Sequence, residues 1–236
     1  DVCSSDLAVT AGYEPGSTFK MITVAAGLNE GLISSDQEFF CEEGEYRIGN
    51  NLIRDSSPQG VLTLEQVLKK SSNICAAKIG MSIPPSRFYD YIMLFGFGQR
   101  PNSGIAAEAS GRVISSKKWK TIDHAAISFG QAILVSPLQM VSAANVFANH
   151  GELVQPYILD HVRDKKGKII KEIKDNDGRL VQKFGSGIRS RVVDASVSEL
   201  IKEYLISVTQ PGGTAELAAI KGYQVAGKTG TSQIFD

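Results

Sequence analysis

Residues 13–20 read Tyr-Glu-Pro-Gly-Ser-Thr-Phe-Lys and place a serine and a lysine three positions apart where a turn becomes a helix. The Pro-Gly pair favours the turn. From residue 18 to residue 28, apolar residues recur at the spacing of one helical face, and the other faces are also largely apolar. This pattern predicts a buried helix. Ser17 then lies in its first turn, and Lys20 projects from the same side.

A lysine in such a helix has two interpretations. Burial lowers the pKa of an ammonium group, and a neutral amine beside a serine hydroxyl can remove its proton and create a nucleophile. The positive N-terminus of the helix would favour the anion that develops there. Alternatively, Ser17 only caps the helix and Lys20 extends its ammonium to solvent. The short pattern alone favours the second interpretation.

The composition is that of an ordinary globular protein. The chain has 25 Lys and Arg and 25 Asp and Glu among 236 residues, so its charge gives no reason to expect binding to nucleic acid or to an anionic membrane surface. No apolar run has the length of a membrane span. The histidines and cysteines lack metal-ligand spacing, and we expect no cofactor or metal. Cys41 and Cys75 either pair in an oxidising compartment or remain buried thiols.

Both ends of the chain are unusual. Residues 1–7 resemble the translation of a common sequencing adapter, so we exclude Cys3 from the native cysteines. The last residues read as the end of a strand that lacks a turn or a cap. We therefore expect residues 8–236 to be one part of a larger protein, truncated on both sides.

Local signals predict a mixed chain of helices and short strands. Gly31 is expected to end the first helix. Further helices are predicted after Thr63, near Ile74, and at Ser86, Ser136 and Asp194, with capping boxes at Thr63 and Ser136. A hairpin is predicted at residues 157–173 and a strand at 223–226, and residues 216–220 look helical. We expect residues 32–62 to be irregular with short β-like pieces, and residues 100–127 and 174–191 to be loops.

The polar motifs of the chain are Ser17-x-x-Lys20, Ser71-x-Asn73 and Lys228-Thr229-Gly230-Thr231. Taken singly, each has a simpler interpretation. Ser71 could merely cap the helix that follows it, and Lys228 could be a solvated charge on an edge strand. Together, and in this order, they match the serine acyl-transfer motifs of penicillin-binding proteins and class A β-lactamases.

With the stretches at residues 128–131 and 135–139, these motifs resemble the transpeptidase domain of class B penicillin-binding proteins, most closely the cell-division and sporulation branch. The resemblance covers nearly everything after Leu7. It implies an α+β fold in which an antiparallel sheet and a helical subdomain enclose the active site. It also implies that only the strand carrying residues 228–231 is present, so that the sheet is incomplete. We therefore expect the isolated chain to fold poorly and activity to require the longer protein.

The resemblance implies a peptidoglycan D,D-transpeptidase that β-lactams inactivate. Ser17 would attack the carbonyl of the penultimate D-alanine of a stem peptide, and Lys20 would take its proton. Ser71 and Lys228 would relay a proton to the leaving D-alanine. A membrane glycan polymerase of the division or elongation machinery is the implied partner. An upstream helix would anchor the whole protein at the extracytoplasmic face of the bacterial membrane.

The resemblance also assigns the substrate contacts. Asn73 would offer its amide to the substrate backbone, and Lys228 with the hydroxyls of Thr229 and Thr231 would bind the terminal carboxylate. The backbone N–H of Thr231 would help to hold the oxyanion. Gly230, which lacks a side chain, would let the substrate lie against the strand.

Two alternative functions are less consistent with the sequence. A serine β-lactamase or a β-lactam sensor domain shares the motifs, but the middle motif is Ser-Ser-Asn, and no Glu-x-x-Leu-Asn stretch is present; Glu108 stands in a different context. Residues 222–229 satisfy the P-loop pattern, which would indicate nucleotide binding. A P-loop needs a strand before its first glycine and a helix after its lysine, and the sequence predicts neither.

Overall fold

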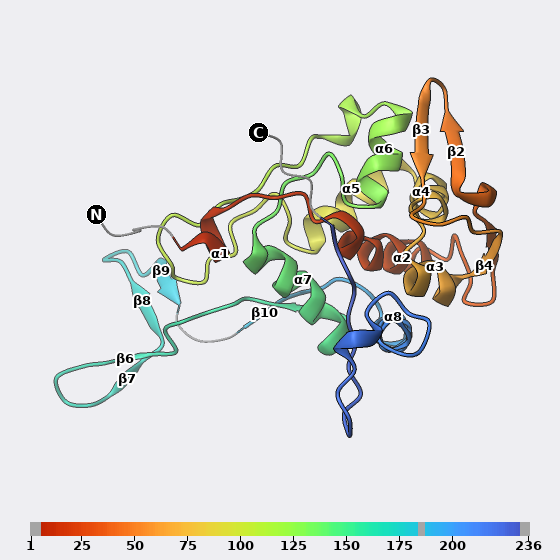
Figure 1. The fold of residues 1–236 in the computed structure, drawn as a ribbon. Helices are drawn as coiled ribbons and strands as arrows, with labels where there is room; N and C mark the ends of the chain where they lie inside the picture. The colour runs from red at the N-terminus through yellow and green to blue at the C-terminus, as the bar shows by residue number, and fades with distance from the viewer. Residues whose placement is uncertain (1–5, 184–186, 232–236) are drawn as a thin grey trace, which may run out of the picture.

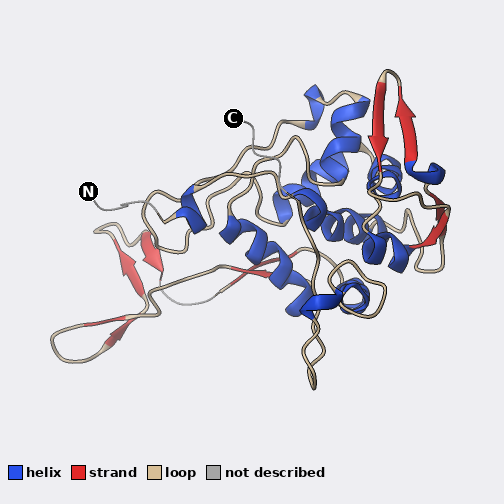
Figure 2. Cartoon of the chain, viewed as in Figure 1, coloured by secondary structure: helices blue, strands red, loops and turns tan. Residues whose placement is uncertain are grey.

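The computed structural model describes residues 6–183 and 187–231. Most helices gather in one body, and two small hairpins extend away from it as an arm (Figure 1). Strands lie on the right-hand side of the helical body and in the arm on the left (Figure 2). Residues 1–5 of the proposed adapter lie outside the described residues, and Leu7 begins the short helix α1 (Leu7–Thr10).

The central element of the body is α2 (Lys20–Asn29), which continues the 3₁₀ turn η1 (Gly16–Phe19). Every residue from Lys20 to Gly27 is buried, as the nearly uniform apolar pattern predicted. Gly31, in the left-handed region at φ +64°, follows its end as expected. The helices packed against α2 are α3 (Leu64–Lys70), α4 (Asn73–Ser82), α5 (Pro85–Leu94) and α8 (Ala195–Val208).

Capping residues begin two helices where the sequence predicted them. Thr63 and Gln66 form the capping box of α3, and Ser136 and Gln139 form that of α7 (Pro137–Ala148). The loop predicted at residues 100–127 contains the turn η3 (Ser116–Lys118). The prediction is wrong for the last residues of this range, because α6 (Thr121–Ser128) forms there. This helix has Lys120 at its N-cap, and a lysine at that position gives no start signal.

The β structure of the described residues consists of antiparallel pairs. The pairs are β1 (Glu38–Phe40) with β4 (Val61–Thr63), β2 (Glu45–Ile48) with β3 (Asn51–Arg54), β5 (Glu152–Val154) with β10 (Ile188–Arg191), β6 (Val162–Arg163) with β7 (Ile169–Ile170), and β8 (Glu172–Lys174) with β9 (Leu180–Lys183). The hairpin predicted at 157–173 is confirmed in β6 and β7. The loop predicted at 174–191 is wrong, since β9 and β10 lie there. Because β8 is exposed on both faces, no apolar alternation indicates this hairpin.

The strand predicted at residues 223–226 does not form. This segment is hydrogen-bonded to the end of α8 instead of to a neighbouring strand. Gly227 N donates to Leu205 O over 3.0 Å, and Thr209 Oγ1 donates to Val225 O over 2.6 Å. Of the helix expected at residues 216–220, only the 3₁₀ turn η4 (Glu216–Ala218) forms. The α+β class itself is confirmed.

A covalent link and a polar cluster fix the helical body. Cys41, in the connection that leads to the turn η2 (Glu42–Gly44), forms a disulfide with Cys75 in the first turn of α4, which decides between the two interpretations of these cysteines.

In the described residues, no helix combines the length and apolar character that a membrane span requires.

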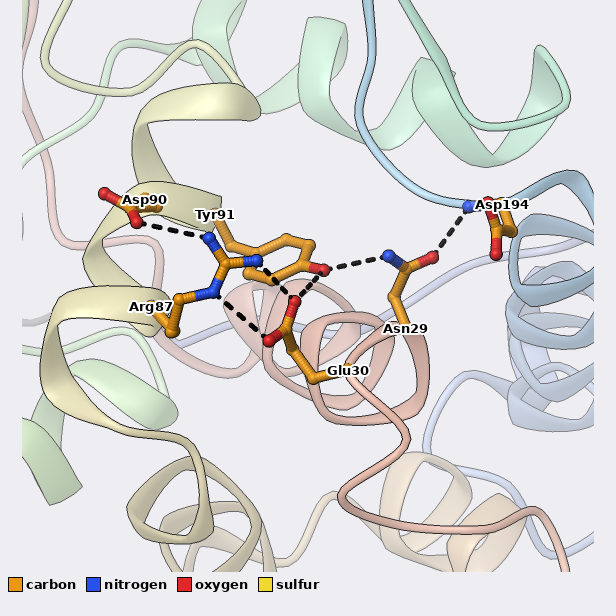
Figure 3. Close-up of polar contacts among 6 residues, drawn as sticks. All are labelled: Asn29, Glu30, Arg87, Asp90, Tyr91 and Asp194. Atoms are coloured by element: carbon orange, nitrogen blue, oxygen red, sulfur yellow. Dashed lines mark hydrogen bonds and ion pairs between the residues drawn. The ribbon is translucent and has the colours of Figure 1, made fainter.

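The polar cluster holds the C-terminal end of α2 to α5 and α8 (Figure 3). Glu30 accepts hydrogen bonds from Arg87 Nη2 at 2.7 Å and from Tyr91 Oη at 2.8 Å. Asn29 Nδ2 donates to the same tyrosine oxygen, and Asn29 Oδ1 accepts from the backbone N–H of Asp194 at 2.7 Å. Three helices therefore meet at one glutamate and one asparagine.

Loss of the Glu30 charge should weaken this cluster. The hydrogen bonds from Arg87 and Tyr91 lower the pKa of Glu30. A carboxyl group whose pKa is lowered by folding stabilises the protein above its unfolded pKa, and the contribution disappears as pH falls through the folded pKa. Glu30→Gln should therefore lower the free energy of unfolding by about 1 kcal/mol at pH 7 and by less at pH 3. Denaturant titrations of the purified protein measure this, with Glu38→Gln on exposed β1 as control; an equal loss at both pH values would contradict it.

Candidate active site

A cavity of about 260 Å³ lies beside η1, and all three polar motifs reach it. Residues that are more than 200 positions apart in the sequence meet there. Lys20 and Lys228 do not line the cavity themselves. Each donates a hydrogen bond to the hydroxyl of Ser71, which does. The motif residues that line the cavity are Ser17, Ser71, Asn73, Thr229, Gly230 and Thr231.

The structure rejects the simpler interpretation of the first motif. Lys20 is fully buried, so its ammonium does not extend to solvent. The N-cap position of η1 is Pro15, whose carbonyl accepts a hydrogen bond from Thr18 Oγ1 at 2.7 Å. Ser17 is therefore not the capping residue. It is half-buried and lines the cavity from the first turn.

The hydroxyl of Ser71 connects the two lysines. Lys228 Nζ donates to Ser71 Oγ at 2.8 Å, and Lys20 Nζ donates to the same oxygen at 3.1 Å and to the Ser71 carbonyl. Ser71 follows α3 in the left-handed conformation, at φ +61°, which is uncommon for a serine. The cap of α4 is Ser72 and not Ser71, so the simpler interpretation of Ser71 is also wrong.

The two lysines have lowered pKa values. Burial is the main cause of the shift that places the pKa of Lys20 well below its usual value; the charge of Lys228 lowers it further, and Asp55 opposes the change. Burial lowers the pKa of Lys228 to about 8. Because the two amino groups share one hydroxyl, a charge on Lys228 disfavours a charge on Lys20.

Asp55, which the sequence did not indicate, holds the middle motif in place. Its Oδ1 accepts from the backbone N–H groups of Asn73 at 2.5 Å and Ile74 at 3.1 Å, and its Oδ2 accepts from Ser72 Oγ at 2.6 Å. Asn73 Nδ2 donates in turn to the carbonyl of Arg54 at 2.8 Å. The carboxylate thus satisfies free N–H groups at the start of α4, where a negative charge is also favoured.

Close backbone contacts place the C-terminal motif beside Ser17. Gly16 has φ +53°, and a Cβ there would lie 2.3 Å from the carbonyl oxygen of Thr231. Gly130 has φ +83°, and a Cβ added there would lie 2.1 Å from Gly16 O. Gly16 N also donates a hydrogen bond to Gly130 O at 2.9 Å. These contacts require glycine at both positions.

Gly230 also makes a close contact, but with the protein itself. A Cβ on this residue would lie 2.8 Å from Thr18 Cγ2 and 3.2 Å from Pro15 O. A side chain at this position would therefore meet η1, which gives a packing reason for glycine here. Gly230 also lines the cavity, and its expected role in the approach of substrate stays a prediction.

Glu108 and residues 222–229 lie in surroundings that differ from those a β-lactamase or a P-loop requires. The carboxylate of Glu108 is buried and accepts from the backbone N–H groups of Asn102 and Ser103, at 2.6 and 2.7 Å, and it does not line the cavity. Among the described residues that follow Lys228, none is helical, and residues 219–221 before Gly222 form no strand. The strand–loop–helix context of a P-loop is thus absent from the part of the chain that the structure describes.

The chain belongs to the family of penicillin-binding protein transpeptidase domains, and the sequence model of this family matches residues 4–236. It is 30% identical to the probable peptidoglycan D,D-transpeptidase PenA of Neisseria flavescens, over 96% of this chain and 50% of that protein. It is 31% identical to the stage V sporulation protein D of Bacillus subtilis, over 98% of this chain and 34% of that protein.

Solved structures show the same fold. Penicillin-binding protein 3 of Mycobacterium tuberculosis, in complex with aztreonam, superposes with a TM-score of 0.79 at 31% identity, over 96% of this chain and 49% of that one. The chain spans half or less of the length of these proteins. The fold of the penicillin-binding transpeptidase domain, which the motifs implied, is thereby confirmed.

Removal of the Asp55 carboxylate should loosen the middle motif. Asp55→Ala leaves two backbone N–H groups and one hydroxyl without their acceptor, so we expect a loss of about 2–3 kcal/mol in the free energy of unfolding. Asp55→Asn keeps an acceptor and should lose about half as much. Denaturant titration measures both, and Asp177→Ala in an exposed turn is the control. Equal stability of Asp55→Ala and wild type would show that these hydrogen bonds do not hold the motif.

Proposed function

We propose that the protein is a penicillin-binding peptidoglycan D,D-transpeptidase. It transfers an acyl group from D-Ala-D-Ala stem peptides through an acyl-enzyme at Ser17, crosslinks the cell wall, and is inactivated covalently by β-lactams. The observation that carries this proposal is the convergence of a half-buried serine, a fully buried lysine and the Ser71 bridge on one cavity. The similarity to the probable D,D-transpeptidase PenA and to the aztreonam complex supports it.

Acylation begins with a proton transfer. Neutral Lys20 takes the proton of Ser17, and Ser17 Oγ bonds to the carbonyl carbon of the penultimate D-alanine. The carbonyl oxygen becomes an anion, which backbone N–H groups of Ser17 and Thr231 hold. Breaking the peptide bond releases the terminal D-alanine, whose nitrogen receives a proton from Lys20 through the hydroxyl of Ser71. Lys228, bonded to the same hydroxyl, supports this relay.

The acyl-enzyme is then resolved by an amine of a second stem peptide. That amine attacks the ester carbonyl and forms a new amide bond, the ester bond to Ser17 Oγ breaks, and the proton that the amine loses returns to Ser17. Before acylation, the terminal carboxylate of the donor peptide is held by Lys228 and by the hydroxyls of Thr229 and Thr231. Asn73, fixed at the cavity wall by its bond to Arg54 O, binds the substrate backbone.

A serine β-lactamase or a sensor domain is the alternative within the same family. The burial of Glu108 against residues 102–103 favours the transpeptidase, because this glutamate is not placed to activate a water molecule at the acyl-enzyme. The lifetime of the acyl-enzyme distinguishes the two functions. Turnover of a bound penicillin within seconds would favour hydrolysis.

We place this activity at the extracytoplasmic face of the bacterial cell membrane, in a longer protein that is anchored there by an N-terminal helix. A membrane glycan polymerase of the division or elongation machinery supplies the glycan strands that it crosslinks. The similarity to the probable peptidoglycan D,D-transpeptidase PenA supports a cell-wall setting.

Covalent labelling tests the nucleophile. Fluorescent penicillin should label the full-length protein, and Ser17→Ala should lose the label completely because no ester can form. Ser115→Ala, in an exposed turn outside the cavity, should be labelled like wild type. The measurement is in-gel fluorescence after denaturation. Label that persists in Ser17→Ala would remove Ser17 as the nucleophile.

The pH dependence of acylation tests the lysine pair. The rate should rise with pH as Lys20 becomes neutral, and it should fall above a pH of about 8, where Lys228 loses the charge that holds the carboxylate. Lys228→Arg keeps its charge, so its profile should lack the alkaline decline, although its rate is lower. Stopped-flow acylation by a chromogenic cephalosporin measures both, with exposed Lys221→Arg as control. An identical decline in Lys228→Arg would assign it to another group.

A further inference from the structure

The loop that follows α8, residues 209–215, reaches the active-site cavity at one residue, although none of the three motifs includes it. Thr214 lines the cavity. Its backbone N–H donates to the carbonyl of Lys69 at 3.3 Å, and Lys70 Nζ donates to the carbonyl of Gly212 at 2.9 Å. These two lysines end α3, directly before Ser71. The loop is therefore fixed to the same turn that presents the middle motif.

The other end of the loop is fixed as well. Ala215 N donates to Val208 O at 3.0 Å, and a Cβ on Gly213 would lie 2.1 Å from that same oxygen. The backbone of the loop is thus packed closely against the end of α8. Hydrogen bonds on both sides of the exposed Thr214 anchor the loop, and such anchoring is what a residue needs if it is to hold another side chain in place.

The hydroxyl of Thr214 contacts the carboxylate-binding motif. Thr214 Oγ1 lies 2.9 Å from Thr229 Oγ1, and Lys228 Nζ donates to Thr229 Oγ1 at 3.4 Å. A hydroxyl group has one proton and two lone pairs. When Lys228 and Thr214 both donate to Thr229, its two lone pairs are occupied. The Thr229 proton is then available only to an acceptor in the cavity.

We propose that Thr214 is a specificity-determining residue, which orients the hydroxyl of Thr229 as a hydrogen-bond donor and so selects ligands that carry a carboxylate. This rests on the proposed function of the cavity. In the opposite orientation Thr229 donates to Thr214 and offers the ligand only lone pairs, which repel an anion. A carboxylate therefore favours the first orientation, whereas an uncharged ester gains much less from it. Thr214 is a positioning residue that acts through Thr229.

The test compares two probes that differ only in the carboxylate, benzylpenicillin and its methyl ester. Thr214→Val, which has the same shape without the hydroxyl, should lower the second-order rate of acylation by benzylpenicillin about tenfold and by the ester less than about twofold. Thr214→Ser keeps the hydroxyl and should restore the wild-type ratio of the two rates. Thr121→Val, at the exposed start of α6, is the control for the Thr-to-Val change.

The outcomes separate this inference from the proposed function. Equal losses with both probes, or no loss in Thr214→Val, would overturn the role of Thr214 while wild-type acylation still supports the transpeptidase. Failure of the wild-type full-length protein to react with benzylpenicillin would overturn the proposed function, and the inference with it. If Thr214→Val does not fold, Thr214→Ala must give the same selective loss, and an unchanged ratio in that variant would overturn the inference.

Discussion

The site depends on one amine that is kept out of water. Lys20 is fully buried in the central helix, and burial makes its charged form unfavourable. Such a group is tolerated only when its remaining protons have partners, and Ser71 supplies both a carbonyl and a hydroxyl. In its left-handed conformation at the end of α3, Ser71 presents both oxygens to the same lysine nitrogen.

The rest of the site consists of supports for this arrangement. Asp55 holds the turn after Ser71 from the outside by accepting two backbone N–H groups and one hydroxyl. On the other side, Gly16 and Gly130 let three segments approach until their backbones touch. Polar contacts and small residues, and not a continuous sheet, position the reactive groups in the described part of the chain.

The sequence predicted those structural features that neighbouring residues determine. The cap at Ser136 and the buried helix after Ser17 could be predicted directly, because neighbouring residues determine them. The role of Asp55 could not be predicted, since its partners lie 17 to 19 positions away and an aspartate before two serines is an ordinary turn residue. Residues 223–226 have the composition of a strand, but a strand forms only beside a partner strand. Here the hydrogen-bond partner is the end of α8.

The Cys41–Cys75 disulfide closes a covalent ring that contains both Asp55 and the turn it holds. Because the cysteines are 34 positions apart in the sequence, such a ring lowers the conformational entropy of the unfolded protein by an amount worth about 4 kcal/mol. The same polypeptide produced in a reducing cytoplasm and in an oxidising compartment therefore begins folding from two different ensembles. The redox state of the compartment therefore acts on the segment that carries the middle motif, although neither cysteine lines the cavity.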